Sequence, residues 1–403
     1  MTSPVGVGAL SAAAGSPRSV RLPFANSRRV GGAARGLRAA RGLRSAAATA
    51  GLAIATALGP GISASSLTPD RPAAIRVETS APHMGTLVRL VLYAPSTAAG
   101  ETAAAAAFAR IAAIEARLSD YRDDSEVAAL SRAAAGVPIA VSEDLFAVLA
   151  ASDAIARRAD GAFDITAGRL THLWRRARHL NAWPDAARVA AARNAGGFAK
   201  VRLDPRQRTV TLAESGIEID AGGIAKGYAA EAALDVLRGE GIGVALVAIG
   251  GDIVAGDPPP DQAGWRIAIP RLDSDQPHWI SIAGAAVSTS GDAEQWMTVD
   301  GIRRSHVIDL RTGWPVAGRR ATSVVAAHGI DADAVDTAIN ILDDEAGARL
   351  LRTVAGPGPG TAGAQALWQR LDPGGTAGVA LHHSADWPVI ARPISGLTLR
   401  GTP

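Results

Sequence analysis

One segment constrains the fold of this 403-residue chain more than any other: it runs from Asp220 to Tyr228 and reads Asp-Ala-Gly-Gly-Ile-Ala-Lys-Gly-Tyr. A carboxylate, paired glycines and a lysine in this order are typical of a strand-to-helix junction. Glycines let the backbone approach a ligand, and the start of the helix offers free N–H groups to an anion. Lysine is rare here, since Lys200 and Lys226 are the only two. The segment predicts a phosphate site, although a tight turn and a solvated lysine fit the same residues.

A second segment, Ala332–Ile339, predicts the first turns of a helix and places two oxygen donors on one face. Asp333 and Thr337 are four residues apart, which is one helical turn. Carboxylate and hydroxyl oxygens are hard donors that suit Mg²⁺ or Ca²⁺, and Mg²⁺ keeps positions for water and substrate phosphates. A helix in which Asp331 or Asp333 is the N-cap, with Thr337 at the surface, fits these residues as well.

Further motifs follow one another along the chain. They are Met84-Gly85-Thr86, Ser119-Asp120-Tyr121 with Ser125-Glu126, Gly161 to Thr166, Ile249 to Asp252, Ser288 to Asp292, and His306 to Pro315. In this order and at these spacings the set resembles the ApbE family, the FAD:protein FMN transferases, over about residues 75 to 355. The combination is far more specific than any single motif.

The resemblance implies a site for FAD, as substrate, and for Mg²⁺. The metal would be held by Asp333, Thr337 and the main-chain carbonyl of Gly223. The residues that would hold the flavin dinucleotide are Met84, Tyr121, Ala162, Phe163, Asp164, Asp220 and Lys226, and Asp336 would touch the ligand or stand behind the metal. Catalysis would depend on Asp333, Lys226 and His306.

Two of these roles have alternatives. Lys226 would offset charge on the pyrophosphate, but a structural ion pair with Asp220 fits it too. A hydroxyl nucleophile benefits from a base, and His306 and Asp309 lie in one motif. Strand alternation places residues three apart on opposite faces, so we do not expect them to act as a pair. His306 fits equally well a role in ordering the loop at Thr312.

Three positions depart from the usual pattern of the family. Ala221 stands where leucine is common, Leu310 where proline is common, and Glu231 where aspartate is frequent. The first two changes are apolar and leave the ligands intact. Glu231 would alter a second metal position, if one exists.

The activity implied is Mg²⁺-dependent transfer of the FMN moiety of FAD to a Thr or Ser hydroxyl of an acceptor protein, with release of AMP. The acceptor would be a redox or electron-transfer protein with a flavinylation motif. One alternative is an Mg²⁺-dependent FAD pyrophosphatase, in which water replaces the hydroxyl. The other is a non-enzymatic periplasmic FAD carrier, against which the intact Asp333 and Thr337 argue, because a carrier needs no metal at the scissile phosphates.

Residues 1–64 have the layout of an export signal. Residues 1–44 hold eight arginines and no acid, and an Ala-rich apolar run of 14 residues follows at 45–58. Ser27-Arg28-Arg29 is a candidate twin-arginine element. A membrane anchor or a disordered basic arm are alternatives, but about 20 apolar residues are needed to span a bilayer. We expect an exported protein on the periplasmic or cell-envelope side, without stable membrane insertion after cleavage.

Charge and cysteine content narrow the class of protein. The formal net charge is +3, but without the eight arginines of residues 1–44 the 41 Lys and Arg fall to 33, against 38 Asp and Glu. We therefore expect no nucleic-acid partner. Cysteine is absent, which excludes a disulfide framework and a lipid anchor on a lipobox cysteine.

The pattern of elements predicts an α+β fold with mixed or antiparallel sheets and packed helices, similar to the T-fold-like catalytic domain of the ApbE family, over residues 65–355. Residues 356–403 begin as a Gly-Pro linker and are expected to complete the domain with strands. The helices expected are Ala103–Leu118, Glu143–Arg158 and Ile224–Arg238. The strands expected are Val77–Tyr93 as one or two, Lys200–Leu203, Thr209–Leu212, Val244–Ile249, Trp265–Ile269, Ser305–Ile308, Thr322–Ala327, Val379–His382 and Pro388–Ala391.

Overall fold

Antiparallel strands and packed helices make up the part of the chain that the computed structural model describes. That part comprises residues 74–291, 296–299, 302–358, 360–371, 379–384 and 387. Every named strand in it pairs in antiparallel fashion with its neighbours. The predicted α+β class is therefore confirmed, whereas the export signal at 1–64 and the strand at 388–391 lie outside the described residues.

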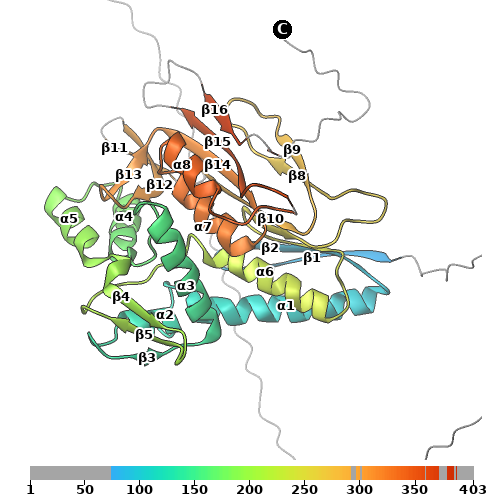
Figure 1. Ribbon diagram of the computed structural model, residues 1–403, viewed down its shortest axis with the longest axis horizontal. Coiled ribbons are helices and arrows are strands. Elements are labelled where there is room, and N and C mark those ends of the chain that lie inside the picture. The colour runs from blue at the N-terminus through green and yellow to red at the C-terminus, as the bar shows by residue number, and fades with distance from the viewer. Residues whose placement is uncertain are drawn as a thin grey trace, which may run out of the picture. The chain divides into compact units, whose positions relative to one another are not determined.

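The largest element is an eight-stranded sheet in the order β1-β2-β6-β7-β10-β14-β15-β16 (Figure 1). Its strands are β1 (Ile75–His83), β2 (Thr86–Ala94), β6 (Ala245–Ile249), β7 (Asp252–Ala255), β10 (Ala285–Gly291), β14 (Arg319–Ala326), β15 (Gln365–Leu371) and β16 (Ala380–His383). Along β2, Leu90 and Leu92 belong to one apolar core and Val91 to another. This alternation shows that the sheet is buried on both faces.

Helices cover one face of the sheet and a β-hairpin covers the other. The helices are α1 (Thr97–Leu118), α6 (Ala225–Gly239) and α7 (Gly329–Ile339), and the hairpin is formed by β8 (Trp265–Ile269) and β9 (His278–Ile282). In α1, the buried residues Ala103, Ala104 and Ala107 leave room for α6 to pack closely. The small side chains of this Ala-rich stretch thus determine how near the two helices come.

The remaining elements pack partly against α1 and α7 and partly against one another. They are α2 (Glu126–Ser131), β3 (Ile139–Ala140), α3 (Glu143–Arg158), α4 (Gly168–Leu180), α5 (Ala186–Ala195), the 3₁₀ turn Phe198–Lys200, β4 (Val201–Asp204), β5 (Thr209–Leu212), β11 (Trp296–Val299), β12 (Ile302–Asp309), β13 (Trp314–Ala317) and α8 (Asp344–Leu351). Helix α4 packs against α5 and β12. Trp174, Trp183 and Trp314 join these elements, with ring centroids 5.2 to 5.9 Å apart.

Two glycines let α6 and α7 cross at close range. A Cβ placed on Gly227 would lie 2.0 Å from the carbonyl oxygen of Gly329, and a Cβ on Gly329 would lie 2.3 Å from that of Gly227. No side chain fits at either position. The crossing brings Lys226, in the first turn of α6, to 3.8 Å from Oδ1 of Asp333 on α7.

Most of the expected elements are present, with ends shifted by a few residues. The range 77–93 forms the β1–β2 hairpin, and β16 confirms the strand expected at 379–382. The strand expected before Gly222 is wrong, because Glu218 makes only an isolated bridge with Ala167 and the helix begins at Ala225. None of the described helices combines the length and the apolar character that crossing a bilayer requires.

Candidate functional site

A cavity of about 720 Å³ lies among α4, α6, α7 and β12 and gathers most of the predicted site. The predicted residues that line it are Met84, Tyr121, Ala162, Phe163, Asp164, Asp220, Gly223, Lys226, His306, Asp333 and Thr337. Asp336 is fully buried behind Asp333 and does not line the cavity. A volume of this size suits a cofactor-sized ligand.

Asp333 and Thr337 lie on the buried side of α7, as the four-residue spacing predicts. Asp333 is 1% exposed, and its Oδ2 accepts a hydrogen bond from the N–H of Gly227 at 3.0 Å. A Cβ on Gly223 would lie 3.1 Å from Oγ1 of Thr337, so the glycine backbone lies directly against this hydroxyl. The N-cap alternative is wrong, because His328 occupies that position and Asp333 lies in the second turn.

Lys226 forms its ion pair with Asp252 and not with Asp220. Its Nζ also lies 3.8 Å from Oδ1 of Asp333. Burial alone would lower the pKa of Lys226, but the carboxylates of Asp252 and Asp333 outweigh it and raise that pKa. These two carboxylates therefore keep Lys226 positively charged where it lines the cavity.

A hydrogen-bonded chain extends behind Lys226 because β7 and β10 pair in a register that puts Ser288 directly opposite Asp252. The hydroxyl of Ser288 donates to Asp252 and lies 3.2 Å from Oδ2 of Asp336. The other oxygen of Asp336, Oδ1, is buried and makes no hydrogen bond of good geometry within the described residues, and hydrogen bonding from Ser290 and Ser288 only partly opposes the rise that burial causes in the pKa of this carboxyl.

Three buried carboxylates thus surround one ammonium group. Burial raises the pKa of Asp333 to about 7, repulsion from Asp252 adds to the rise, and the pKa of Asp336 also lies well above its usual range. The described residues contain no group of three or more His, Cys, Asp or Glu side chains that could hold a metal by themselves. Asp333, Thr337 and Gly223, the residues that the family resemblance implies as Mg²⁺ ligands, all line the cavity and offer oxygen donors of the type that Mg²⁺ prefers. We call this region the acidic end of the cavity.

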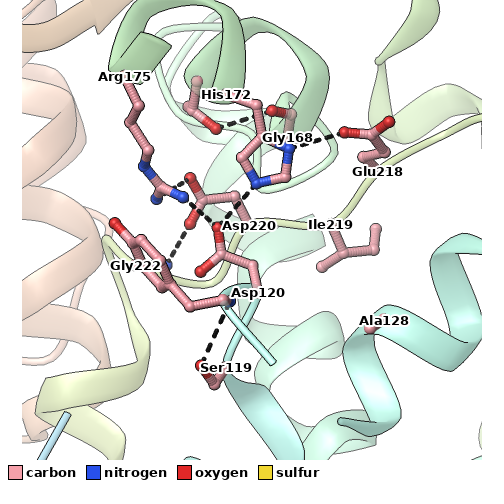
Figure 2. Close-up of polar contacts among 12 residues, drawn as sticks. Ser119, Asp120, Ala128, Gly168, His172, Arg175, Glu218, Ile219, Asp220 and Gly222 are labelled. Atoms are coloured by element: carbon pink, nitrogen blue, oxygen red, sulfur yellow. Dashed lines mark hydrogen bonds and ion pairs between the residues drawn. The ribbon is translucent and has the colours of Figure 1, made fainter. Parts of the chain in front are cut away.

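At the other end of the cavity, Arg175 on α4 joins two buried carboxylates (Figure 2). Its Nη1 donates to Asp120 and its Nη2 donates to Oδ2 of Asp220 at 2.8 Å. The free oxygen of Asp220 accepts a hydrogen bond from the N–H of Gly222, also at 2.8 Å. The carboxylate of Asp220 therefore stabilises the glycine turn through this hydrogen bond.

Tyr121 presents an exposed ring beside this arginine. The residue is 77% exposed, and Cζ of Arg175 lies 4.5 Å from the ring centroid. A guanidinium group on one face holds the ring while most of its surface stays accessible. The ring can therefore serve as a platform for a flat ligand such as a flavin or an adenine. We call the Tyr121–Arg175–Asp120–Asp220 set the ring end.

Ala162, Phe163 and Asp164 line the walls of the cavity, and their contacts are mainly with other parts of the protein. Ala162 and Phe163 are 1% and 3% exposed and belong to the main core. The carboxylate of Asp164 accepts from the N–H and hydroxyl of Thr166, at 2.8 and 2.7 Å, and from the N–H of Phe198 at 2.7 Å. Both oxygens of Asp164 are thus used in hydrogen bonds that hold the segments at Thr166 and Phe198 together.

His306, on β12, is exposed and lines the cavity, whereas Asp309 forms an ion pair with Arg311 at 2.9 Å. Of the two candidate bases, His306 is the one in reach of a ligand. Met84 lines the cavity from the β1–β2 turn, where it adopts φ 51°. Glu231 caps the start of α7, with Oε2 accepting from the N–H of Gly329 at 2.9 Å and Oε1 2.7 Å from Nδ1 of His328.

The sequence matches the model of the ApbE family over residues 84–357, which is more than half of the chain. The chain belongs to the ApbE family. An FAD:protein FMN transferase of Treponema pallidum is 33% identical over 291 residues, which cover 68% of this chain and 80% of the relative. One from Klebsiella pneumoniae is 32% identical over 278 residues, covering 68% and 84%.

Solved structures of the ApbE family share the fold. The flavin transferase ApbE of Vibrio cholerae superposes with a TM-score of 0.67 at 26% identity, covering 77% of this chain and 98% of that one. The flavinyl transferase ApbE of Pseudomonas stutzeri, in its apo form, gives 0.67 at 26% identity, covering 78% and 96%. Both comparisons confirm the expected ApbE-like fold, and family membership makes the chain a transferase.

Three residues of this ApbE site were missed from the sequence. Asp120 and Asp252 stood in motifs that gave them no role, and Arg175 stood in an Arg-rich stretch with no signal of its own. The acids that Arg175 contacts lie 55 and 45 residues away. The Ser119-Asp120-Tyr121 motif was the one sequence signal available, because it places an acid next to the aromatic side chain of Tyr121 and an acid at a site calls for a cationic partner.

Proposed function

We propose that this chain transfers the FMN moiety of FAD to a threonine or serine hydroxyl of an acceptor protein, releases AMP, and uses Mg²⁺. The observation that carries the proposal is the joining, in one cavity, of the acidic end around Lys226 and the ring end at Tyr121. A dinucleotide has the matching parts, namely an anionic pyrophosphate between two aromatic systems. The activity of the relatives, which are FAD:protein FMN transferases and a flavin transferase, supports this proposal.

The proposed reaction is a phosphoryl-group substitution. The hydroxyl oxygen of the acceptor attacks the phosphorus on the FMN side, and the bond from that phosphorus to the bridging oxygen breaks. AMP leaves with the bridging oxygen, and FMN stays on the acceptor as a phosphoester. The hydroxyl proton passes to His306, which is exposed at the cavity and is the base that the geometry favours.

Positioning and electrostatics supply most of the catalysis in such a reaction. The ammonium of Lys226 offsets the negative charge of the pyrophosphate, and the turn at Gly222 and Gly223 brings backbone close to it. Asp333, Thr337 and the carbonyl of Gly223 would hold Mg²⁺, which neutralises phosphate charge when bound. Tyr121 would stack on one ring of the substrate.

The acceptor in this proposal is a redox or electron-transfer protein with a Thr or Ser in a flavinylation motif. The enzyme would meet it on the periplasmic or cell-envelope side, because the layout of residues 1–64 favours export, with the twin-arginine route as one possibility. Recovery of the mature chain from the periplasmic fraction would test this location, and recovery only from the cytoplasm would contradict it.

The test of the activity is to incubate the purified chain with FAD, Mg²⁺ and a threonine-containing acceptor domain. Flavin fluorescence that survives denaturation, together with AMP, is expected only when Mg²⁺ is present. An acceptor with its threonine changed to valine is the control and should stay unlabelled. AMP with free FMN would indicate a pyrophosphatase instead, and tight FAD binding without either product would indicate a carrier.

A further inference from the structure

Helices α4 and α5 carry a concentration of positive charge that the rest of the domain lacks. Residues 168–195 contain six arginines and two histidines but a single acid, Asp185. Residues 45–403 as a whole have the opposite balance, with 33 Lys and Arg against 38 Asp and Glu. The two helices pack against each other, and α4 lines the cavity with Trp174, Arg175 and Arg178. The charge is therefore gathered at one side of the site.

Part of this charge is neutralised within the fold (Figure 2). Nε of Arg169 lies 3.4 Å from Glu218, and His172 contacts Glu218 at 2.8 Å and Asp120 at 3.1 Å. Arg175 is held between Asp120 and Asp220, as described above. These contacts account for Arg169, His172 and Arg175.

Three other arginines of α4 and α5 make no such contacts. The side chains of Arg176, Arg178 and Arg188 form neither an ion pair nor a hydrogen bond within the described part of the chain. Arg176 and Arg188 are exposed, and Arg178 is half-buried at the edge of the cavity. We call these three arginines, with the exposed His179, the basic face.

The charge of FAD does not explain the basic face. At neutral pH, FAD carries its negative charge on the pyrophosphate, which the proposed function places at Lys226 and the Gly222–Gly223 turn. Arg178 instead lines the cavity from α4, as Arg175 does at the ring end. A cation at this end, with two more exposed arginines on the same pair of packed helices, matches an anion that approaches from solvent.

We propose that the basic face docks an acidic segment of the acceptor protein beside its flavinylated threonine or serine. This rests on the proposed function, since it names the chemistry of the polypeptide that must reach the same cavity. The acidic segment would lie along α4 and α5, so that the acceptor hydroxyl enters beside Arg178. Complementary charge would raise the rate of encounter and fix the direction in which the acceptor chain lies.

The test uses two synthetic peptides with one threonine each. In the first, glutamates flank the threonine on both sides, and in the second each glutamate is replaced by glutamine. Flavin transfer from FAD is followed by peptide mass, with AMP measured in parallel. We expect kcat/KM for the acidic peptide to be about tenfold higher, and this preference to fall as salt is raised.

Two charge-reversed variants make the test specific. Arg176→Glu with Arg188→Glu should abolish the preference for the acidic peptide and leave KM for FAD unchanged, because neither residue lines the cavity. Arg202→Glu with Arg206→Glu is the matched control, since both arginines are exposed, lie outside this cavity and form no ion pair with any residue that the structure describes. That control should keep the preference although it carries the same change in net charge.

Each outcome bears on a different claim. Equal labelling of the two peptides, or an equal loss of preference in both variants, would overturn the docking surface and leave the proposed function intact. If neither peptide is labelled while FMN and AMP are released, the proposed function fails and the docking surface with it. If the basic face binds anionic phospholipid vesicles without any peptide preference, its partner is a membrane surface and the acceptor proposal is wrong.

Discussion

The two ends of the cavity treat buried charge in opposite ways. At the acidic end, Asp252, Asp333 and Asp336 share one ammonium, and Oδ1 of Asp336 makes no hydrogen bond of good geometry within the described residues. At the ring end, Arg175 bridges both of its acids, and the remaining oxygen of Asp220 is used by the backbone of Gly222. At the first end three buried carboxyl groups lie around one ammonium and two of them have raised pKa values, whereas at the second end one guanidinium contacts both carboxylates.

This difference indicates that the two ends of the cavity have different roles. Buried carboxyl groups that share one ammonium are costly to ionise until a further cation binds, so the acidic end is suited to binding and to function. Carboxylates that are hydrogen-bonded by a guanidinium and a backbone N–H are stable without a ligand and hold the shape of the turn and the aromatic ring. Substitutions should therefore affect activity at the acidic end more than stability, and stability at the ring end at least as much as activity.

The largest effect is expected for Asp333→Asn. The amide oxygen can still accept from Gly227, but the charge for Mg²⁺ is lost, so flavin transfer should fall about 10²- to 10³-fold. The melting temperature without Mg²⁺ should not decrease, because a poorly compensated buried charge is removed. AMP release and thermal melting check both points. Activity within tenfold of the parent would contradict the assignment of Asp333.

Gly227→Ala tests the geometry of the acidic end without touching its charges. The added methyl group would lie 2.0 Å from the carbonyl oxygen of Gly329, so α6 and α7 must move apart. We expect a loss of about 3 kcal/mol in the free energy of unfolding. Urea denaturation measures it. Gly239→Ala is the control in the same helix, because nothing lies within 4 Å of that position, and it should be neutral or slightly stabilising.

Arg175→Met breaks the ring end. Asp120 and Asp220, whose side chains are 7% and 8% exposed, lose their shared cation, so the free energy of unfolding should fall by about 2 to 4 kcal/mol. KM for FAD should rise about tenfold while the Mg²⁺ dependence stays the same. Adding Asp120→Asn and Asp220→Asn should recover much of the stability. If the stability does not recover, buried charge is not the cause.

The smallest effect is expected from the titration of His172. Hydrogen bonds to Asp120 and Glu218 raise its pKa, against burial and the nearby Arg175. A raised pKa means that this histidine stabilises the fold at pH below its unfolded value, near 6.5, and that the contribution is lost as pH rises through the folded pKa. The stability difference between the parent and His172→Gln should therefore shrink from pH 5.5 to pH 8.5, and it should stay below about 1 kcal/mol because the group is partly exposed. A difference that grows with pH would contradict this.

The spacing of residues along the chain determined several helices and strands and part of the site. The helical period alone put Asp333 and Thr337 on one face, and α7 confirms it. The alternating pattern of 77–93 predicted paired strands, and the order of the motifs identified the family. Such features depend on residues close in sequence, so the chain specifies them without the rest of the fold.

The tertiary structure decided which charges meet. Asp220 is the nearest acid to Lys226 in the motif, yet the lysine pairs with Asp252, and Arg175 takes Asp220 instead. The register of β7 against β10 and the glycine crossing of α6 with α7 set those partners. Burial makes an unpaired charge expensive, so pairing is settled by whichever oppositely charged groups the packed core brings together, and sequence spacing carries little information about that.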